Sequence, residues 1–153
     1  MEQDKLKQKV LHYLNTHRIL TMATASSNGT PDATALEYAN DGFIVIVAVR
    51  PNSKKVQNIK ENPHVFYEIH EDIEITLENV QNLQALQVSA TPNILTYGGE
   101  GFNDNFDIME KKFPVFNRIP RHKRVILEFT PKKIWFLNYA ESMFHRDELN
   151  FED

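Results

Sequence analysis

The sequence predicts a mainly β protein, a small antiparallel barrel of six or seven strands into which short helices are inserted. Short stretches rich in β-forming residues recur along the chain, and tight-turn residues separate the first three of them. Short turns of this kind join antiparallel neighbours. Helical periodicity is confined to short segments, so the regular alternation of strand and helix that builds a parallel sheet is missing.

Size and composition fit one globular domain, residues 1–153, with 41% hydrophobic and 25% charged residues. The net charge of −4 argues against general nucleic-acid binding. The absence of cysteine excludes disulfides and thiolate metal sites. No apolar run reaches the roughly 20 residues of a membrane span, and the first residues do not resemble a signal peptide. We therefore expect a soluble, cytoplasmic protein that contacts neither membrane nor nucleic acid.

The first half of the chain predicts a helix followed by three strands. Residues 3–16 carry apolar side chains on one helical face. The strands are RILTMATA, PDATALEYA and FIVIVAV, separated by Asn28-Gly29 and by Asn40-Asp41-Gly42. The third strand is apolar at every position, so we expect both of its faces to be buried. A second helix then begins after Ser53, which suits an N-cap, and ends at Asn62-Pro63.

The second half predicts further strands around one short helix. HVFYEI reads as a strand, and the alternation in IEITL indicates a strand or part of a hairpin. LQALQVSAT is expected to be a strand that Pro92 stops, and a glycine-rich loop and a helix near residues 106–113 follow it. RVILEFT and KKIWFLNY are expected to form two strands around a turn at Pro131. The tail, from about 141 to 153, is polar and is expected to fray.

The strongest candidate site is the start of the second helix, at Ser53-Lys54-Lys55. Lysine is unfavourable at a helix N-terminus, which carries partial positive charge. A bound anion reverses this, because free N–H groups, a hydroxyl and ammonium groups all favour phosphate, and Arg50 stands just before them. The alternative is that both lysines simply point into water.

The other motifs give weaker indications of a functional site. The loop YGGEG lacks the lysine and the strand-to-helix context of a phosphate-binding loop. The basic stretch RIPRHKR, residues 118–124, is interpreted as a solvated loop in preference to a phosphate or partner site. The six histidines show no metal-ligand spacing, so no metal site is expected. No serine stands in a nucleophile-elbow motif.

The order and spacing of several motifs resemble a known family. The motifs are Ala23-Thr24, Asn28-Gly29-Thr30-Pro31, Gly42, Ser53-Lys54-Lys55 and the run from Asn58 to Val65. Together they resemble the N-terminal signature of the pyridoxamine 5′-phosphate oxidase-like, FMN-binding split-barrel superfamily. LQVSATP and RVILEFTPKKIWFLNY are similar to its later strands, so the resemblance covers about residues 10 to 140. KKFPV together with IWFLNY also resembles a small, uncharacterised bacterial branch of that superfamily.

The resemblance implies a split β-barrel of Greek-key type that forms a homodimer and holds FMN in clefts between the subunits. It assigns the FMN phosphate to Ser53, Lys54 and Lys55. It assigns backbone contacts with flavin and ribityl to Ala48 and Val49. It places Leu36 and Glu37 at the edge of the isoalloxazine ring.

The sequence also departs from the true oxidase. Asp32 and Glu37 stand where that enzyme carries basic residues, Val49 replaces a threonine and Ala90 a glycine, and the closing arginine-rich signature is missing. We therefore expect an FMN-dependent oxidoreductase that acts on some other small molecule, with no catalytic residue assigned. The alternatives are a non-catalytic protein that binds or stores a flavin, haem or deazaflavin, and a structural dimer with an empty cleft.

Overall fold

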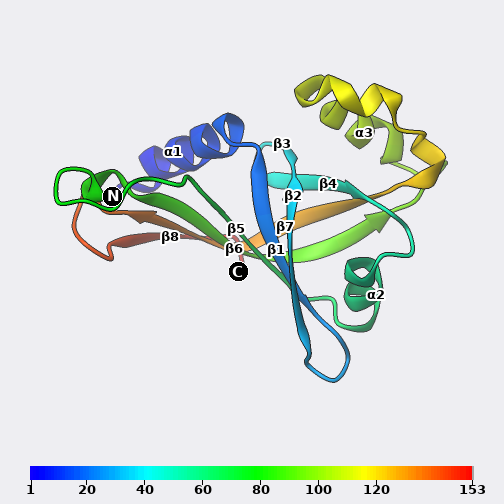
Figure 1. The fold of residues 1–153 in the computed structure, drawn as a ribbon, viewed down its shortest axis with the longest axis horizontal. Coiled ribbons are helices and arrows are strands. Elements are labelled where there is room, and N and C mark those ends of the chain that lie inside the picture. Colours follow the sequence, from blue (N-terminus) through cyan, green and yellow to red (C-terminus); the bar gives the residue numbers. More distant parts are fainter. Residues whose placement is uncertain (153) are drawn as a thin grey trace.

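The computed structural model describes residues 1–152 and forms one antiparallel sheet of eight strands with three α-helices (Figure 1). The strands are β1 (Ile19–Ala25), β2 (Pro31–Glu37), β3 (Ala39–Asp41), β4 (Ile44–Val49), β5 (Val65–His70), β6 (Gln84–Leu95), β7 (Val125–Asn138) and β8 (Arg146–Asn150). The helices are α1 (Gln3–Thr16), α2 (Lys54–Glu61) and α3 (Phe102–Lys112). Short 3₁₀ turns lie at Val80–Asn82, Pro114–Arg118 and Arg121–Lys123. None of the helices in residues 1–152 combines the length and the hydropathy needed to cross a bilayer.

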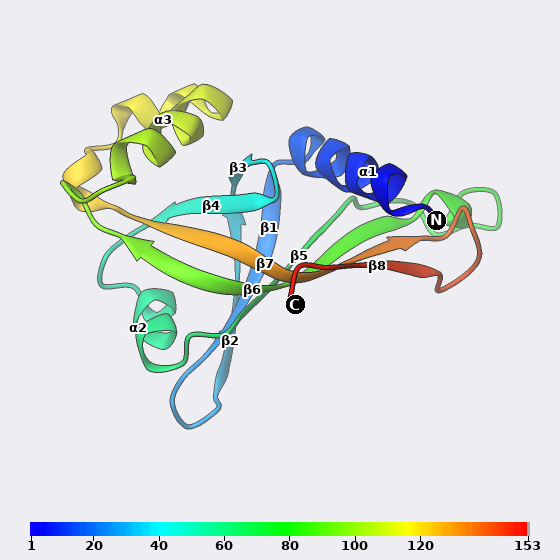
Figure 2. The ribbon, with the colours of Figure 1, turned by 180° about the vertical axis from the view of Figure 1, so that it is seen from behind.

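The strand order explains how the sheet curls into an open barrel. The order is β2-β1-β5-β6-β7-β4-β3, with β8 added to β7, and every paired strand is antiparallel. Strands β2 and β3 stand at opposite ends of this order, yet only Tyr38 separates them in the chain. The chain therefore turns at Tyr38 from one end of the sheet to the other. Figure 2 shows β2 and β3 from behind. The predicted mainly β, split-barrel fold is confirmed.

The predicted burial of both faces of the third strand is also confirmed, because β4 separates two hydrophobic clusters. Val45, Val47 and Val49 belong to the main core inside the barrel, which α1 and α2 also enter. Ile46 and Ala48 face a smaller cluster formed with α3. Side chains alternate along a strand, so a strand covered on both sides must be apolar throughout.

Strands β6 and β7 form a long ribbon, and the sequence-based prediction for both was wrong. Each strand continues through its proline, so Pro92 does not stop a strand and Pro131 does not make a turn. Strand β6 pairs with β5 only as far as Ala90, so at Pro92 it has β7 as its one strand neighbour. Strand β7 pairs with β4 up to Phe129 and with β8 from Lys133, so Pro131 lies between the two. A missing N–H is tolerated where one side of a strand has no partner.

Three further predictions need correction. IEITL forms no strand: the chain from 71 to 79 is a loop that pairs with no strand of the described sheet, and Leu77 is 94% exposed. PDATALEYA is two strands rather than one, since it bends at Tyr38. The tail is not frayed throughout: β8 pairs with β7 and buries Leu149, which raises the strand count to eight.

Candidate functional site

The candidate site is built around the connection from β4 to α2. Strand β4 ends at Val49, and a short turn closed by the Ser53 N–H donating to the Arg50 carbonyl leads into α2. Ser53 is the N-cap, and its carbonyl accepts the first helical hydrogen bond, from Gln57. The opposite face of α2 buries Val56 and Ile59 in the main core, which fixes where the helix begins.

The Ser53 hydroxyl is the unusual feature of this helix start. An N-cap serine ordinarily accepts a hydrogen bond from an N–H of the first turn. Here the side chain makes no capping bond, and Oγ is shielded from solvent without a hydrogen-bond partner among residues 1–152. A buried hydroxyl without a partner costs about 1–3 kcal/mol. Ser53 therefore offers a polar atom that is already desolvated and is not used within the described chain.

A cavity of about 580 Å³ lies beside Ser53. Its lining comes from the end of β2, the end of β4, the start of α2 and the segment before β7: Leu36, Glu37, Ala48, Val49, Arg50, Asn52, Ser53, Lys55, Phe116, Ile119 and Arg124. Six of the seven residues predicted to bind cofactor are thus brought together. The seventh, Lys54, does not line the cavity and is exposed. Consecutive helical residues point about 100° apart, so Lys54 leaves α2 on a different side from Lys55. Only Lys55 faces the cavity.

The lining of the cavity combines positively charged and apolar side chains. Arg50, Lys55 and Arg124 supply the positive charge, and none of them forms an ion pair with a carboxylate of residues 1–152. Glu37 is the one acidic residue in the lining. The apolar lining consists of Leu36, Ala48, Val49, Phe116 and Ile119. This combination suits a ligand with an anionic group at one end and an apolar body at the other.

Sequence reasoning missed part of this site. Phe116, Ile119 and Arg124 reach the cavity because β7 pairs with β4, from Val49 opposite Val125 onwards. The available signal was the basic stretch 118–124, which was interpreted as a solvated loop. Within that stretch Arg124 lines the cavity instead, whereas Arg121 binds α3. The stretch is thus a surface segment in which Ile119, Arg121 and Arg124 are half-buried.

A separate, larger cavity of about 770 Å³ lies between α1 and the ends of β6 and β7. Its lining includes His12, Tyr13 and His145, and His145 Nε2 lies 3.1 Å from Asp147 Oδ2. The cavity beside Ser53 contains no histidine, methionine or tyrosine in its described lining. Within residues 1–152 no group of three or more His, Asp or Glu side chains is arranged to hold a metal ion.

Comparison with known protein families identifies the family of this chain. The family model described as pyridoxamine 5′-phosphate oxidase matches residues 6–138 of the chain. The chain belongs to this family. The match spans β1 to the end of β7, and so includes every residue that lines the cavity beside Ser53.

Individual relatives within and around the family differ in their named roles. General stress protein 26 of Bacillus subtilis is 31% identical over 65 residues, which are 42% of this chain and 46% of that protein. The alignment thus spans less than half of that relative. HutZ, the haem storage protein from Vibrio cholerae, has a TM-score of 0.70 at 15% identity over 82% of this chain and 89% of its own. An F420 reductase has a TM-score of 0.57 at 22% identity over 82% and 94%. At these identities the two structures show a common fold.

Proposed function

We propose that this family member binds FMN in the cavity beside Ser53 and acts in the cytoplasm as a flavin-dependent oxidoreductase on a small molecule. The observation that carries the proposal is the buried, unpartnered Ser53 hydroxyl in a cavity that also holds unpaired cations and an apolar wall. A phosphate would satisfy the hydroxyl and neutralise the cations. The apolar wall would take a planar ring system.

The residues of the cavity divide naturally between the two ends of such a ligand. Ser53 can donate its O–H to a phosphate oxygen, and Lys55, Arg50 and Arg124 can donate charge-assisted hydrogen bonds to the same group. A carboxylate only accepts hydrogen bonds, so Glu37 suits an N–H on a ring edge and not the phosphate. The apolar wall excludes water from the ring.

When bound, the flavin would supply hydride or electron transfer, while the protein supplies binding, orientation and electrostatics. Oxidation of pyridoxamine phosphate itself is not part of the proposal, because the arginine-rich signature that would hold that substrate is missing from the sequence. A deazaflavin, as the name of the F420 reductase suggests, would have the same requirements of this cavity, namely a planar ring and a phosphate.

We further propose that the protein is a homodimer. Phe66 on β5 is 42% exposed, and its two neighbours in the strand, which point to the opposite face, are buried. Its ring stacks on that of Trp135 from β7, with centroids 5.7 Å apart. A partly exposed aromatic pair on one face of a sheet is the kind of surface that subunit contacts use. This supports an interface on that face of β5.

A thermal-shift titration with FMN and with riboflavin tests the proposal. A ligand that binds the native state raises the melting temperature by mass action, so FMN should raise it. Riboflavin lacks the phosphate and should raise it less at equal concentration. No shift with FMN would overturn the proposal. Bleaching of the bound flavin by a reduced nicotinamide without oxygen would then support the oxidoreductase, and an unchanged spectrum would contradict it.

The second candidate function is haem storage, and one observation favours it. Haem is held in proteins by histidine, methionine, cysteine or tyrosine, and the cavity beneath α1 offers His12, Tyr13 and His145. HutZ, with the same fold, is named for haem storage. A haem titration distinguishes the two candidates: a Soret band that disappears in His12→Ala/His145→Ala and is unaffected by excess FMN would support a separate haem site.

A further inference from the structure

A second cavity, also of about 580 Å³, adjoins the one beside Ser53. Its lining is Arg50, Pro51, Asn52, Arg118, Ile119, Pro120, Lys123 and Arg124. Four of these residues, namely Arg50, Asn52, Ile119 and Arg124, line both cavities. The two cavities therefore adjoin along these four residues and together form a longer groove.

The second cavity carries positive charge alone. Arg50, Arg118, Lys123 and Arg124 line it, no described aspartate or glutamate does, and none of the four is ion-paired within residues 1–152. The whole chain has a net charge of −4, so this concentration of cations is local. Like charges gathered in one groove repel each other, and a bound anion with several negative charges removes that cost.

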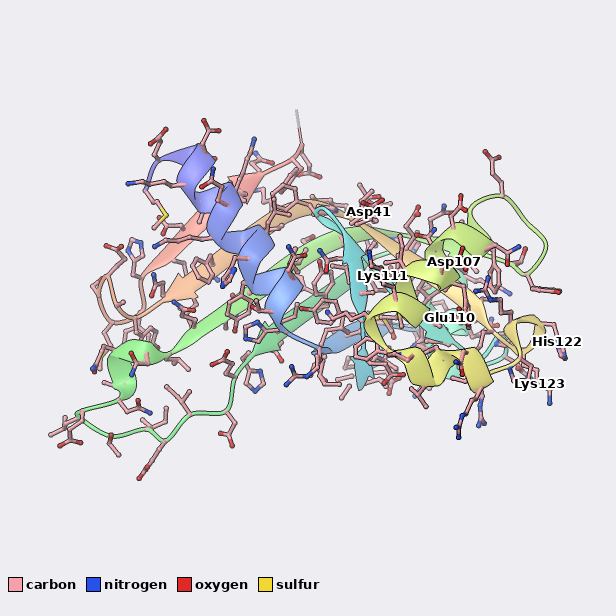
Figure 3. The ribbon with its side chains drawn as sticks, turned by 90° about the horizontal axis from the view of Figure 1, so that it is seen from above. Asp41, Asp107, Glu110, Lys111, His122 and Lys123 are labelled. Atoms are coloured by element: carbon pink, nitrogen blue, oxygen red, sulfur yellow. The ribbon has the colours of Figure 1, made fainter. Side chains whose placement is uncertain are left out.

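The basic segment is held in place by the one arginine that does not line the groove. Arg121 Nη2 lies 2.6 Å from Asp107 Oδ1 and 3.2 Å from Glu110 Oε2, both on α3. Its guanidinium also lies 4.6 Å from the centre of the Phe106 ring. In Figure 3 Asp107 and Glu110 lie on α3, and Lys123 lies beyond the helix at the outer edge of the molecule. Arg121 therefore anchors the segment from the α3 side and leaves its other basic side chains available.

We propose that Arg118 and Lys123, together with Arg50 and Arg124, which line both cavities, form a second anion subsite. It takes the further phosphate of a diphosphate nucleotide whose first phosphate lies at Ser53 and Lys55. The proposal rests on the function proposed above and narrows its ligand. A flavin mononucleotide fills only the first subsite. A flavin dinucleotide, FAD, adds a second phosphate directly beyond the first, in the direction in which the groove continues.

The test compares FMN and FAD binding by flavin fluorescence at fixed ionic strength. The informative variant is Arg118→Ala/Lys123→Ala, because these two residues line the second cavity and not the first. Lys7→Ala/Lys111→Ala is the matched control, since it removes two positive charges at exposed positions outside both cavities. Arg118→Gln/Lys123→Gln replaces the alanine variant if the latter fails to fold, as judged by circular dichroism.

The wild type should bind FAD about tenfold more tightly than FMN, since two charge-assisted contacts are added. Arg118→Ala/Lys123→Ala should lose that preference and keep its FMN affinity within about twofold. The control should keep both affinities. Equal binding of FMN and FAD by the wild type, or an equal loss for both ligands in the variant, would overturn the second subsite and leave the proposed function standing. Failure of the wild type to bind either flavin would overturn both.

Discussion

Asn58 Nδ2 donates a hydrogen bond to Thr24 Oγ1 over 3.1 Å, and both side chains are buried. The contact joins α2 to β1 across 34 residues of sequence. Both residues belong to the motifs that carry the family resemblance, which gives those motifs a physical role. They fix α2 against the barrel, and α2 in turn carries Ser53 and Lys55 to the cavity.

Breaking this contact should cost stability. Asn58→Ala leaves the buried Thr24 hydroxyl without its partner and should lower the free energy of unfolding by about 1–3 kcal/mol. Thr24→Val should lower the free energy of unfolding by a similar amount, because it leaves the buried Asn58 amide without its acceptor. Each single substitution leaves one buried group unpaired, and the double variant removes both groups. The double variant should therefore lose less stability than the sum of the two single losses. Urea denaturation measures all three, and strictly additive losses would show that the bond contributes nothing of its own.

The two lysines at the start of α2 should have unequal effects on ligand binding. Lys55 lines the cavity and Lys54 does not. Lys55→Ala should weaken FMN binding by about tenfold, the equivalent of one charge-assisted hydrogen bond. Lys54→Ala removes the same charge one residue earlier and should change the affinity by less than about threefold, since only long-range attraction is lost. Titration of FMN fluorescence gives both values, and a larger effect from Lys54 would contradict the geometry of the cavity.

Lys112 should make stability depend on pH in the alkaline range. Its Nζ lies 4.1 Å from the centre of the Tyr38 ring and donates to the His17 carbonyl. Burial, with a smaller effect of Arg18, lowers the pKa of Lys112 to about 8. A lysine in the unfolded chain has a pKa of about 10.4, so between the two values the unfolded state binds more protons. This residue therefore makes the free energy of unfolding rise as the pH increases through that window.

The control for this effect is Lys112→Met, which keeps the length of the side chain but cannot titrate. As the pH rises from about 7.5 to 10, the free energy of unfolding of the wild type should increase by roughly 1–2 kcal/mol relative to that of Lys112→Met. Other titrating groups are common to both proteins and cancel in the difference. Parallel stability curves over this range would show that Lys112 titrates normally.

The proposed dimer should depend on Phe66. Replacement by glutamate places a charge on the exposed aromatic face of β5, and burying that charge in an interface is unfavourable. Phe66→Glu should therefore run as a monomer in size-exclusion chromatography with light scattering. Ile75→Glu is the control, because Ile75 is 67% exposed in the loop from 71 to 79, away from the sheet face. A monomeric wild type, or a dimer that survives Phe66→Glu, would overturn the interface.

Local signals in the sequence predicted the local parts of the fold well. Asn28-Gly29 gives the hairpin between β1 and β2, in which Gly29 takes a φ of 85° that other residues avoid. The apolar run of β4 predicted a strand covered on both sides. Ser53 predicted the start of α2, and with it the position of the candidate site.

Long-range pairing could not be predicted in the same way. Whether Pro131 makes a turn or lies within a strand depends on which strands flank it, and no local residue pattern records that. The same holds for Arg124, which reaches the cavity only because Val125 pairs with Val49. The short β8 contributes a single buried residue, Leu149, which is too weak a pattern to distinguish from a polar tail.

The pairing of β4 with β7 also determines when in synthesis the cavity beside Ser53 can be completed. Until β7 leaves the ribosome, β4 has only the three-residue strand β3 as a strand neighbour. Phe116, Ile119 and Arg124 precede β7 in the chain, but the pairing that brings this segment to the cavity has not yet formed. Contacts between segments so far apart in sequence form late, after the entropy of closing the intervening chain has been overcome. A nascent chain that ends before β7 has no complete cavity. A ligand that needs the complete cavity can therefore bind only after β7 has emerged.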